Sequence, residues 1–202
     1  MIRLHTAKTP NGQKASIALE ELGVPYEVRW VHLDKGEQMT PEFLALNPNN
    51  KIPVLEDDGL VIWESGAILL HLAEKYGKLL PADPAGRIHA IQYAFFQTGG
   101  IGPNLGRLGA QLRKPANERN AEMMQVFGDE VSRLIGVIDR ILGDGRSYLA
   151  GEYSIGDIMH YPWLGAMLML KAPPLLERKR VVAWLERIAE RPAVQRGMRV
   201  PE

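Results

Sequence analysis

The chain has 202 residues, of which 46% are hydrophobic and 24% charged, and its 24 basic residues balance its 24 acidic ones. This composition suits a globular protein of one large or two small domains, and the zero net charge gives no sign of nucleic acid as a partner. The chain has no cysteine, which excludes disulfides, thiolate metal sites and a protein cysteine nucleophile. Any thiol chemistry must therefore use a thiol that arrives with a ligand, and no metal site is predicted.

The first ten residues lack the apolar run of a secretory signal. No stretch approaches the roughly 18 apolar residues of a membrane-spanning helix. We therefore expect a cytoplasmic protein without a membrane partner.

Strand and helix signals alternate in the first part of the chain. Residues 2–5 predict a strand, a turn cluster follows at 9–12, and residues 13–22 predict a helix that ends at Gly23. Residues 26–33, rich in Val, Tyr and Trp, predict a second strand. A crossover helix between them predicts that the two strands are parallel.

Thr40-Pro41-Glu42 predicts the start of a short helix, with Thr40 as the N-cap and Pro41 in the first turn. Strands at 54–56 and 60–63 are separated by Asp57-Asp58-Gly59, which is typical of a hairpin. A helix over 65–76 completes an order that predicts a thioredoxin-like α/β domain.

The second part of the chain is expected to be helical throughout. Residues 79–86 predict a linker, and the apolar periodicity of 87–111 is interrupted by glycine and proline at 99–103. Further helices are predicted at 117–142, 154–170 and 176–189, the last one stopping at Arg191-Pro192. The predicted domains are a thioredoxin-like domain over 1–78, a linker over 79–86 and an all-α domain over 87–202.

Four motifs carry a family resemblance. They are Thr9-Pro10-Asn11-Gly12-Gln13-Lys14, Asn47-Pro48-Asn49-Asn50-Lys51-Ile52-Pro53-Val54, Glu64-Ser65-Gly66-Ala67-Ile68-Leu69 and Gly151-Glu152-Tyr153-Ser154-Ile155-Gly156-Asp157-Ile158. In this order the chain resembles the cytosolic glutathione transferases, and within them the nu class, whose bacterial members are disulfide-bond reductase-like. The resemblance implies a thioredoxin-like glutathione-binding domain, an all-α domain and a homodimer.

The resemblance implies a glutathione site around two of these motifs. Ile52-Pro53 would be a cis peptide that exposes strand-edge backbone to the peptide ligand. Ser65 at a helix start would bind the γ-glutamyl carboxylate, and Glu64 would hold the α-amino group. The alternative for Pro53 is an ordinary proline between a loop and a strand. The alternative for Ser65 is that it only caps the helix. The same predicted set includes Asn50, together with Gln38 and Lys51, which match family positions near the glycyl end or backbone of glutathione. The alternative for Lys51 is a solvated surface lysine.

The chemistry requires donors that hold glutathione as a thiolate, since a free thiol has a pKa of about 8.5. No tyrosine precedes Tyr26, and Ser16 lies well into the first predicted helix. Thr9 and Asn11 offer a hydroxyl and an amide near a helix start, and the nu class is similar in placing Thr and Asn beside the sulfur. The alternative is that Thr9 and Asn11 serve only as turn residues and an N-cap.

The resemblance implies a glutathione transferase or disulfide-bond reductase that acts on a small electrophile, disulfide or hydroperoxide. We expect two glutathiones, or one glutathione disulfide, in each subunit. Two alternatives are a glutathione-dependent peroxidase for organic hydroperoxides and a glutathione-binding regulatory protein with little catalysis.

The second substrate is expected among residues of the all-α part, although Phe96 and Trp163 could equally belong to a helix core. The predicted set is Phe96, Asn104, Arg107 and Trp163. Family members also reach across the dimer with a basic residue, and here Met123-Met124-Gln125-Val126 occupies the expected stretch. Arg119 or Arg133 could substitute.

Ser154-Ile155-Gly156-Asp157 has the pattern of a helix-capping box before an apolar run. We expect a structural role for this motif and no catalytic role for Asp157.

Overall fold

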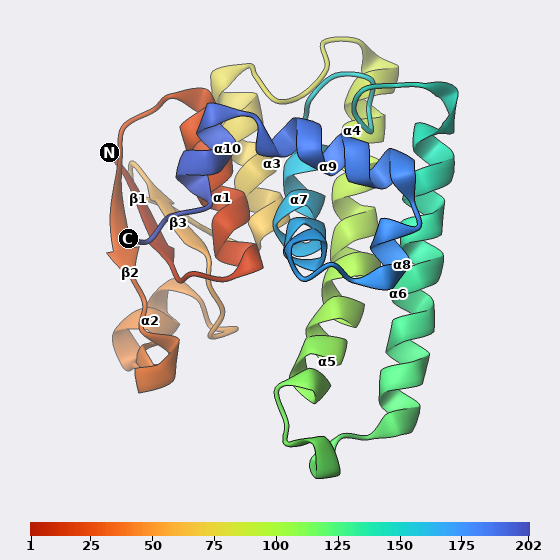
Figure 1. Cartoon of the computed structure of the whole chain (residues 1–202). Helices are drawn as coiled ribbons and strands as arrows, with labels where there is room; N and C mark the ends of the chain where they lie inside the picture. The colour runs from red at the N-terminus through yellow and green to blue at the C-terminus, as the bar shows by residue number, and fades with distance from the viewer. The chain divides into compact units, whose positions relative to one another are not determined.

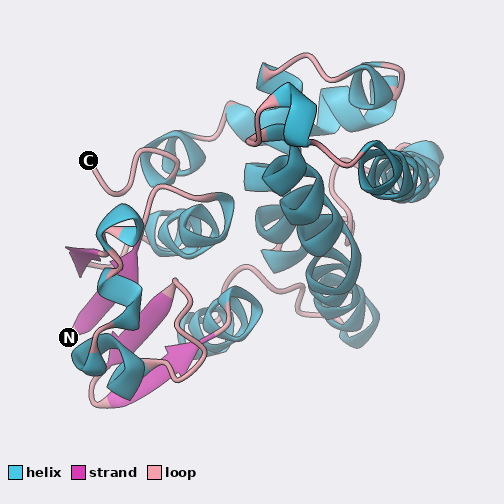
Figure 2. Ribbon diagram, turned by 90° about the horizontal axis from the view of Figure 1, so that it is seen from below, coloured by secondary structure: helices cyan, strands magenta, loops and turns pink.

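The structure is a computed structural model that describes residues 1–202, and its chain forms two compact units. The first unit comprises Met1–Leu80 and Ala189–Glu202, and the second comprises Pro81–Ile188. Figure 1 follows the chain from end to end, and Figure 2 shows that every strand belongs to the thioredoxin-like part. The predicted fold class, a thioredoxin-like α/β domain followed by an all-α domain, is confirmed.

The first unit contains a mixed sheet of four strands in the order β2-β1-β3-β4. The strands are β1 (Ile2–Thr6), β2 (Tyr26–Trp30), β3 (Val54–Asp57) and β4 (Leu60–Trp63). As predicted, β1 and β2 are parallel, and β3 and β4 form an antiparallel hairpin. Strand β3 lies antiparallel to β1, and fully buried Leu4 faces Leu55 between them.

Strand β2 ends three residues before the predicted limit. The chain turns there through two short 3-10 segments, Leu33–Lys35 and Glu37–Met39. Helix α2 (Pro41–Leu46) follows, with the Thr40 hydroxyl accepting the N–H of Phe43 as predicted for an N-cap.

Helix α1 (Pro10–Leu22) begins three residues earlier than predicted. The Thr9 hydroxyl accepts the N–H of Gly12 at 3.2 Å, and Pro10 fills the first position, where no N–H is needed. The predicted turn at 9–12 is therefore wrong, because these residues form the cap and first turn of the helix. Nine residues of α1 are buried, among them Lys14 and Ser16.

Helix α10 (Pro192–Gly197) was not predicted, because Pro192 begins a helix there and was interpreted only as a stop. The helix packs closely on α1: a Cβ added to Gly197 would lie 2.5 Å from the Cα of Ile17. Ser16 donates to the Gly197 carbonyl at 2.7 Å, and the Gln13 amide donates to the Met198 carbonyl at 2.9 Å. These contacts place 189–202 in the first unit, while the domain limits 1–78, 79–86 and 87–202 remain a prediction.

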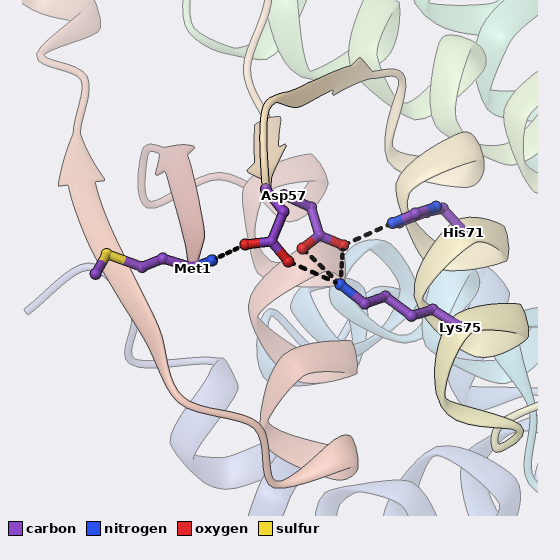
Figure 3. A network of polar contacts seen from close by, with 5 residues as sticks. Met1, Asp57, His71 and Lys75 are labelled. Carbon is purple, nitrogen blue, oxygen red and sulfur yellow. Dashed lines mark hydrogen bonds and ion pairs between the residues drawn. The ribbon is translucent and has the colours of Figure 1, made fainter.

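A buried carboxylate joins the sheet to helix α3 (Ser65–Tyr76), as Figure 3 shows. Asp57 at the end of β3 accepts hydrogen bonds from Lys75 Nζ at 2.6 Å and 2.7 Å and contacts His71 Nε2 at 2.8 Å. Burial alone raises the pKa of Asp57, but the hydrogen bonds from Lys75 and His71 outweigh it and hold the pKa below its ordinary value. The neighbouring Asp58 pairs with the amino group of Met1.

The second unit is formed by helices. They are α4 (Pro84–Phe96), α5 (Gly102–Leu112), α6 (Ala121–Ile141), α7 (Ile155–Met169), α8 (Pro173–Leu176) and α9 (Lys179–Ala189), whose last residue is grouped with the first unit. The predicted interruption at 99–103 is a π-helical segment, Gln97–Ile101, that joins α4 to α5. None of the helices combines the length and the hydrophobicity that crossing a membrane requires.

The predicted capping box begins α7. The Ser154 hydroxyl accepts the N–H of Gly156, and the Asp157 carboxylate accepts the N–H and the hydroxyl of Ser154. Asp157 also accepts the N–H of Leu149 and the indole N–H of Trp184 at 2.8 Å. Complete burial raises the pKa of Asp157 to about 6, against these donors, which lower it. The carboxylate therefore joins the start of α7 to α9, as its predicted structural role requires.

We predict that Asp57→Asn lowers the free energy of unfolding by about 2 kcal/mol at neutral pH, because Lys75 and His71 lose a buried anion. The pKa of Asp57 lies below its unfolded value of about 3.9, so the stabilisation is present above that pH and is lost as pH falls through the folded pKa. Urea unfolding at several pH values should show that the free energies of unfolding of the unmodified protein and of Asp57→Asn become equal in acid. Asp58→Asn is the control, since that side chain is 68% exposed, and an equal loss in it would contradict the assignment.

Removing either partner of the capping box should reduce stability without changing chemistry. Ser154→Ala is expected to cost about 1 kcal/mol. Asp157→Ala should cost about 3 kcal/mol, because several buried donors then have no acceptor. Thermal unfolding measures both, and activity per folded molecule should stay at the level of the unmodified protein. A folded Asp157 variant without activity would show that the carboxylate has a catalytic role.

Candidate functional site

One cavity in the first unit brings together residues from three separate stretches of the chain. Its volume is about 260 Å³. It is lined by Asn11, Asn47, Lys51, Ile52, Pro53, Glu64 and Ser65. Six of these seven residues belong to the set predicted from the sequence. The cavity therefore joins the first turn of α1, the loop before β3 and the start of α3.

The loop before β3 forms one wall of the cavity. Ile52-Pro53 is a cis peptide, as predicted. Buried Asn47 fixes the loop from inside, because its amide donates to the Lys51 carbonyl at 2.7 Å and its oxygen accepts the N–H of Asn49 at 2.9 Å. The Lys51 side chain is exposed and adds a positive charge at the rim.

The start of α3 forms another part of the cavity wall. Glu64 is the N-cap residue with φ of 70°, and its side chain makes no capping hydrogen bond. Ser65, which is 7% exposed, adds a hydroxyl beside the positive end of this 12-residue helix. Such a helix start favours an anion, and the adjacent Glu64 carboxylate favours an amine. The pair suits the amino and carboxylate groups of one amino-acid end.

The first turn of α1 contributes an amide that could act on a sulfur atom. Asn11 lines the cavity, and its Oδ1 accepts a hydrogen bond from Lys14 Nζ at 2.9 Å. Lys14 is 2% exposed, and burial lowers its pKa to about 7, although the nearby Glu64 charge raises it. An amide NH2 and a nearby cation both favour a thiolate over a thiol.

Thr9 is not among the residues that line the cavity, although only Pro10 separates it from Asn11 in the chain. Its hydroxyl oxygen caps α1 by accepting the N–H of Gly12. A hydroxyl can accept and donate at once, so this bond leaves the hydroxyl hydrogen for another acceptor. The capping alternative for Thr9 is therefore observed, and its catalytic role remains a prediction.

Two other predicted glutathione residues lie outside the cavity lining. Gln38 donates from its amide to the Leu33 carbonyl at 3.5 Å, and its buried Oε1 has no hydrogen-bond partner. Asn50 adopts φ of 50°, and its N–H donates to the Asn47 carbonyl. Their roles toward a ligand stay predictions.

A larger cavity, of about 350 Å³, lies elsewhere in the first unit. Its lining is His5, Arg29, Val31, Glu37, Thr40, Glu42, Phe43 and Leu46. None of these residues belongs to the four motifs. Size therefore does not identify the functional site here, and the smaller cavity carries the chemistry that the sequence predicts.

The predicted second-substrate residues all lie in the second unit. Phe96 packs 5.9 Å from the ring of His160, and the Arg107 guanidinium lies 5.6 Å from the ring of Phe127. Asn104 donates to the Gly100 carbonyl at 2.9 Å, one helical turn back. The ring contact of Phe96 fits the helix-core alternative as well as a substrate role. The substrate roles of Phe96, Asn104, Arg107 and Trp163 stay predictions.

The two arginines considered for a role across a dimer both have local partners. Arg119 donates to the carbonyls of Lys114 and Leu112, and Arg133 pairs with Glu130 on α6 at 2.7 Å. To contact glutathione in a second subunit, either arginine would have to give up these local contacts.

Asn47 and Lys14 belong to the four motifs, but their sequence context predicted no function for either. Asn47 had a usable signal, because an asparagine at a helix end before Pro48 often fixes a turn through its side chain. Lys14 also had one, since it stands three residues after Asn11 and therefore on the same helix face. Its burial could not be inferred from this spacing.

Two family models match the chain. The N-terminal domain of glutathione S-transferase matches residues 2–74, and the C-terminal domain matches residues 102–192. Disulfide-bond oxidoreductase YfcG of Escherichia coli (strain K12) is 39% identical over 206 residues, which cover 98% of this chain and 94% of the relative.

Solved structures of bacterial glutathione transferases have the same fold. The enzyme from Pseudomonas putida, with one glutathione disulfide bound per subunit, has a TM-score of 0.93 and 42% identity and covers 100% of this chain and 92% of its own. The enzyme from Burkholderia graminis, with two glutathione molecules bound per subunit, has a TM-score of 0.93 and 41% identity and covers 100% of this chain and 88% of its own.

Asn47→Ala tests how the cavity wall is held. We expect the variant to lose about 2 kcal/mol of stability, because the Lys51 carbonyl and the Asn49 N–H lose their partner. Amide hydrogen exchange should become faster in the loop 49–52 before it does so in the sheet. Asn49→Ala is the matched control, since its exposed side chain lies in the same loop. Unchanged loop exchange in the Asn47 variant would contradict this role.

Proposed function

Because the chain belongs to the glutathione transferase family, we propose that it is a glutathione-dependent disulfide-bond oxidoreductase whose thiolate is stabilised by Asn11 and Thr9. The observation that carries the proposal is the cavity that joins the Asn11 amide to the Ile52-Pro53 loop and to Ser65 at the start of α3. The glutathione disulfide and glutathione bound in the two bacterial enzymes support the same ligand class.

The groups around the cavity complement glutathione along its length. Ser65 and the start of α3 bind the γ-glutamyl carboxylate, and Glu64 holds the adjacent amino group. The backbone of Ile52 pairs with the peptide part, while Lys51, with Gln38 and Asn50, serves the glycyl end. The cysteinyl sulfur then lies toward Asn11 and Thr9.

The reaction is thiol–disulfide exchange with two glutathione molecules. A bound glutathione loses its proton to solvent, and its thiolate attacks one sulfur of the substrate disulfide, which forms a mixed disulfide and releases the other sulfur as a thiolate. A second glutathione thiolate attacks the glutathione sulfur of this mixed disulfide, which forms glutathione disulfide and releases the second substrate thiolate. The released thiolates take up protons, and the substrate gains the two electrons that glutathione loses.

This scheme needs no protein cysteine, in agreement with the composition. Both reducing thiols come from glutathione, so the site must accept two glutathiones or one glutathione disulfide. We place the reaction in the cytoplasm, where glutathione keeps thiols reduced.

We also propose that the partner is a second copy of the chain. Large apolar side chains are exposed on two helices of the second unit, which supports burial against another protein surface. They are Ile88 and Phe95 on α4, and Met123 and Val126 on α6.

The test is reduction of hydroxyethyl disulfide by glutathione. Asn11→Ala should lower kcat by about tenfold to a hundredfold, because a donor to the developing thiolate is lost. Thr9→Ala combined with Asn11→Ala should lower it further, and Asn49→Ala, an exposed asparagine near the cavity, is the control.

Calorimetry with glutathione and an organic hydroperoxide assay separate the alternatives. A protein that binds glutathione but reduces hydroxyethyl disulfide no faster than the double variant is not the proposed reductase. Preferred turnover of hydroperoxide would favour the peroxidase, and binding without any turnover would favour the regulatory protein.

A further inference from the structure

Lys14 is a lysine inside the hydrophobic part of α1. Its side chain is 2% exposed, and it lies among buried Ala15, Ile17 and Ala18. A charged amine in such a place is costly unless it has a compensating partner. The thiolate chemistry proposed above does not use it directly, so its position requires a separate explanation.

One partner that the structure provides is Asn11, one helical turn earlier. Lys14 Nζ donates to Asn11 Oδ1 at 2.9 Å, and the opposite charge that acts on the amine is that of Glu64. Both partners line the cavity, whereas Lys14 itself does not. Lys14 therefore lies beneath the cavity and can act on a ligand through Asn11.

The chemistry of the amine determines how Asn11 is oriented. Lys14 Nζ donates to the carbonyl oxygen of the Asn11 amide, and in its ammonium form it has three donors and no acceptor, so that form selects the oxygen. The NH2 group then lies on the end of the amide that does not face Lys14, in a residue that lines the cavity. Lys14 therefore favours the orientation in which the amide oxygen, which would repel a thiolate, faces the amine.

We propose that Lys14 is a positioning residue that holds the Asn11 amide with its NH2 toward the sulfur of bound glutathione. The inference rests on the proposed function and adds a residue to it. A thiolate in the cavity and an ammonium behind Asn11 favour each other across the polarised amide, so ligand ionisation and Lys14 protonation are coupled.

The experiment measures the pKa of the bound glutathione thiol from its thiolate absorbance as a function of pH. Lys14→Met, which keeps the length and removes the donor, should raise that pKa by about one unit, a tenfold loss of thiolate below the pKa. The Kd for glutathione should change by less than about threefold, since the contacts to its two ends remain. A merely structural role would leave the thiol pKa unchanged.

A double-mutant cycle shows whether Lys14 acts through Asn11. In an Asn11→Ala background, Lys14→Met should have no further effect on the thiol pKa. An equal rise in both backgrounds would show that Lys14 acts by its own charge and would overturn the proposal. Lys8→Met is the matched control, because this exposed lysine precedes the same helix start and its loss removes the same charge.

A measurement on the unaltered protein makes the proposal testable even if the variants do not fold. In the glutathione complex, the Asn11 side-chain NH2 protons should show nuclear Overhauser effects to the cysteinyl methylene of glutathione. Effects to the Lys14 methylene next to Nζ instead would mean the opposite amide orientation and would overturn the proposal. Failure of the unaltered protein to bind glutathione would remove the proposed function itself, which is a separate outcome.

Discussion

Two glycines fix helix α1 where no larger residue would fit. A Cβ on Gly12 would lie 2.3 Å from the Ala7 carbonyl oxygen, and one on Gly197 would lie 2.5 Å from the Cα of Ile17. The helix is thereby held between the end of β1 and α10. Since Asn11 precedes Gly12 directly, the same contact sets the position of the Asn11 backbone beside the cavity. The position of Asn11 at the candidate site therefore depends on this packing.

The cavity is formed by short segments of the chain, and other parts of the first unit hold these segments in place. Asn47 fixes the loop of Lys51 from inside, and Asp57 joins β3 to α3, the helix whose first residue is Ser65. A positive rim, a carboxylate and a helix start then face the same 260 Å³ space. Because the protein contains no thiol, these groups can only orient and ionise a thiol that belongs to the ligand.

Local sequence patterns predicted most of the helices and strands. They failed at prolines, because a proline can either interrupt a helix or occupy its first position. Pro10 and Pro192 each occupy the first position of a helix, whereas the turn and stop interpretations treated them as interruptions. Pro41 was predicted correctly because Thr40 gave a clear cap signal. The capping box of Ser154 and Asp157 was predicted for the same reason, although its bond to Trp184 was not.

The sequence by itself determined the order of the elements, the family resemblance and the exclusion of a protein thiol, because these follow from neighbouring residues and composition. Only the tertiary structure decided which polar residues are buried and what they face. Local patterns predict that Lys14 is exposed at the surface. The periodicity of one helix cannot show that the helix is covered on several sides. Its contact with Asn11, and the meeting of three distant segments at one cavity, exist only when long-range packing brings them together.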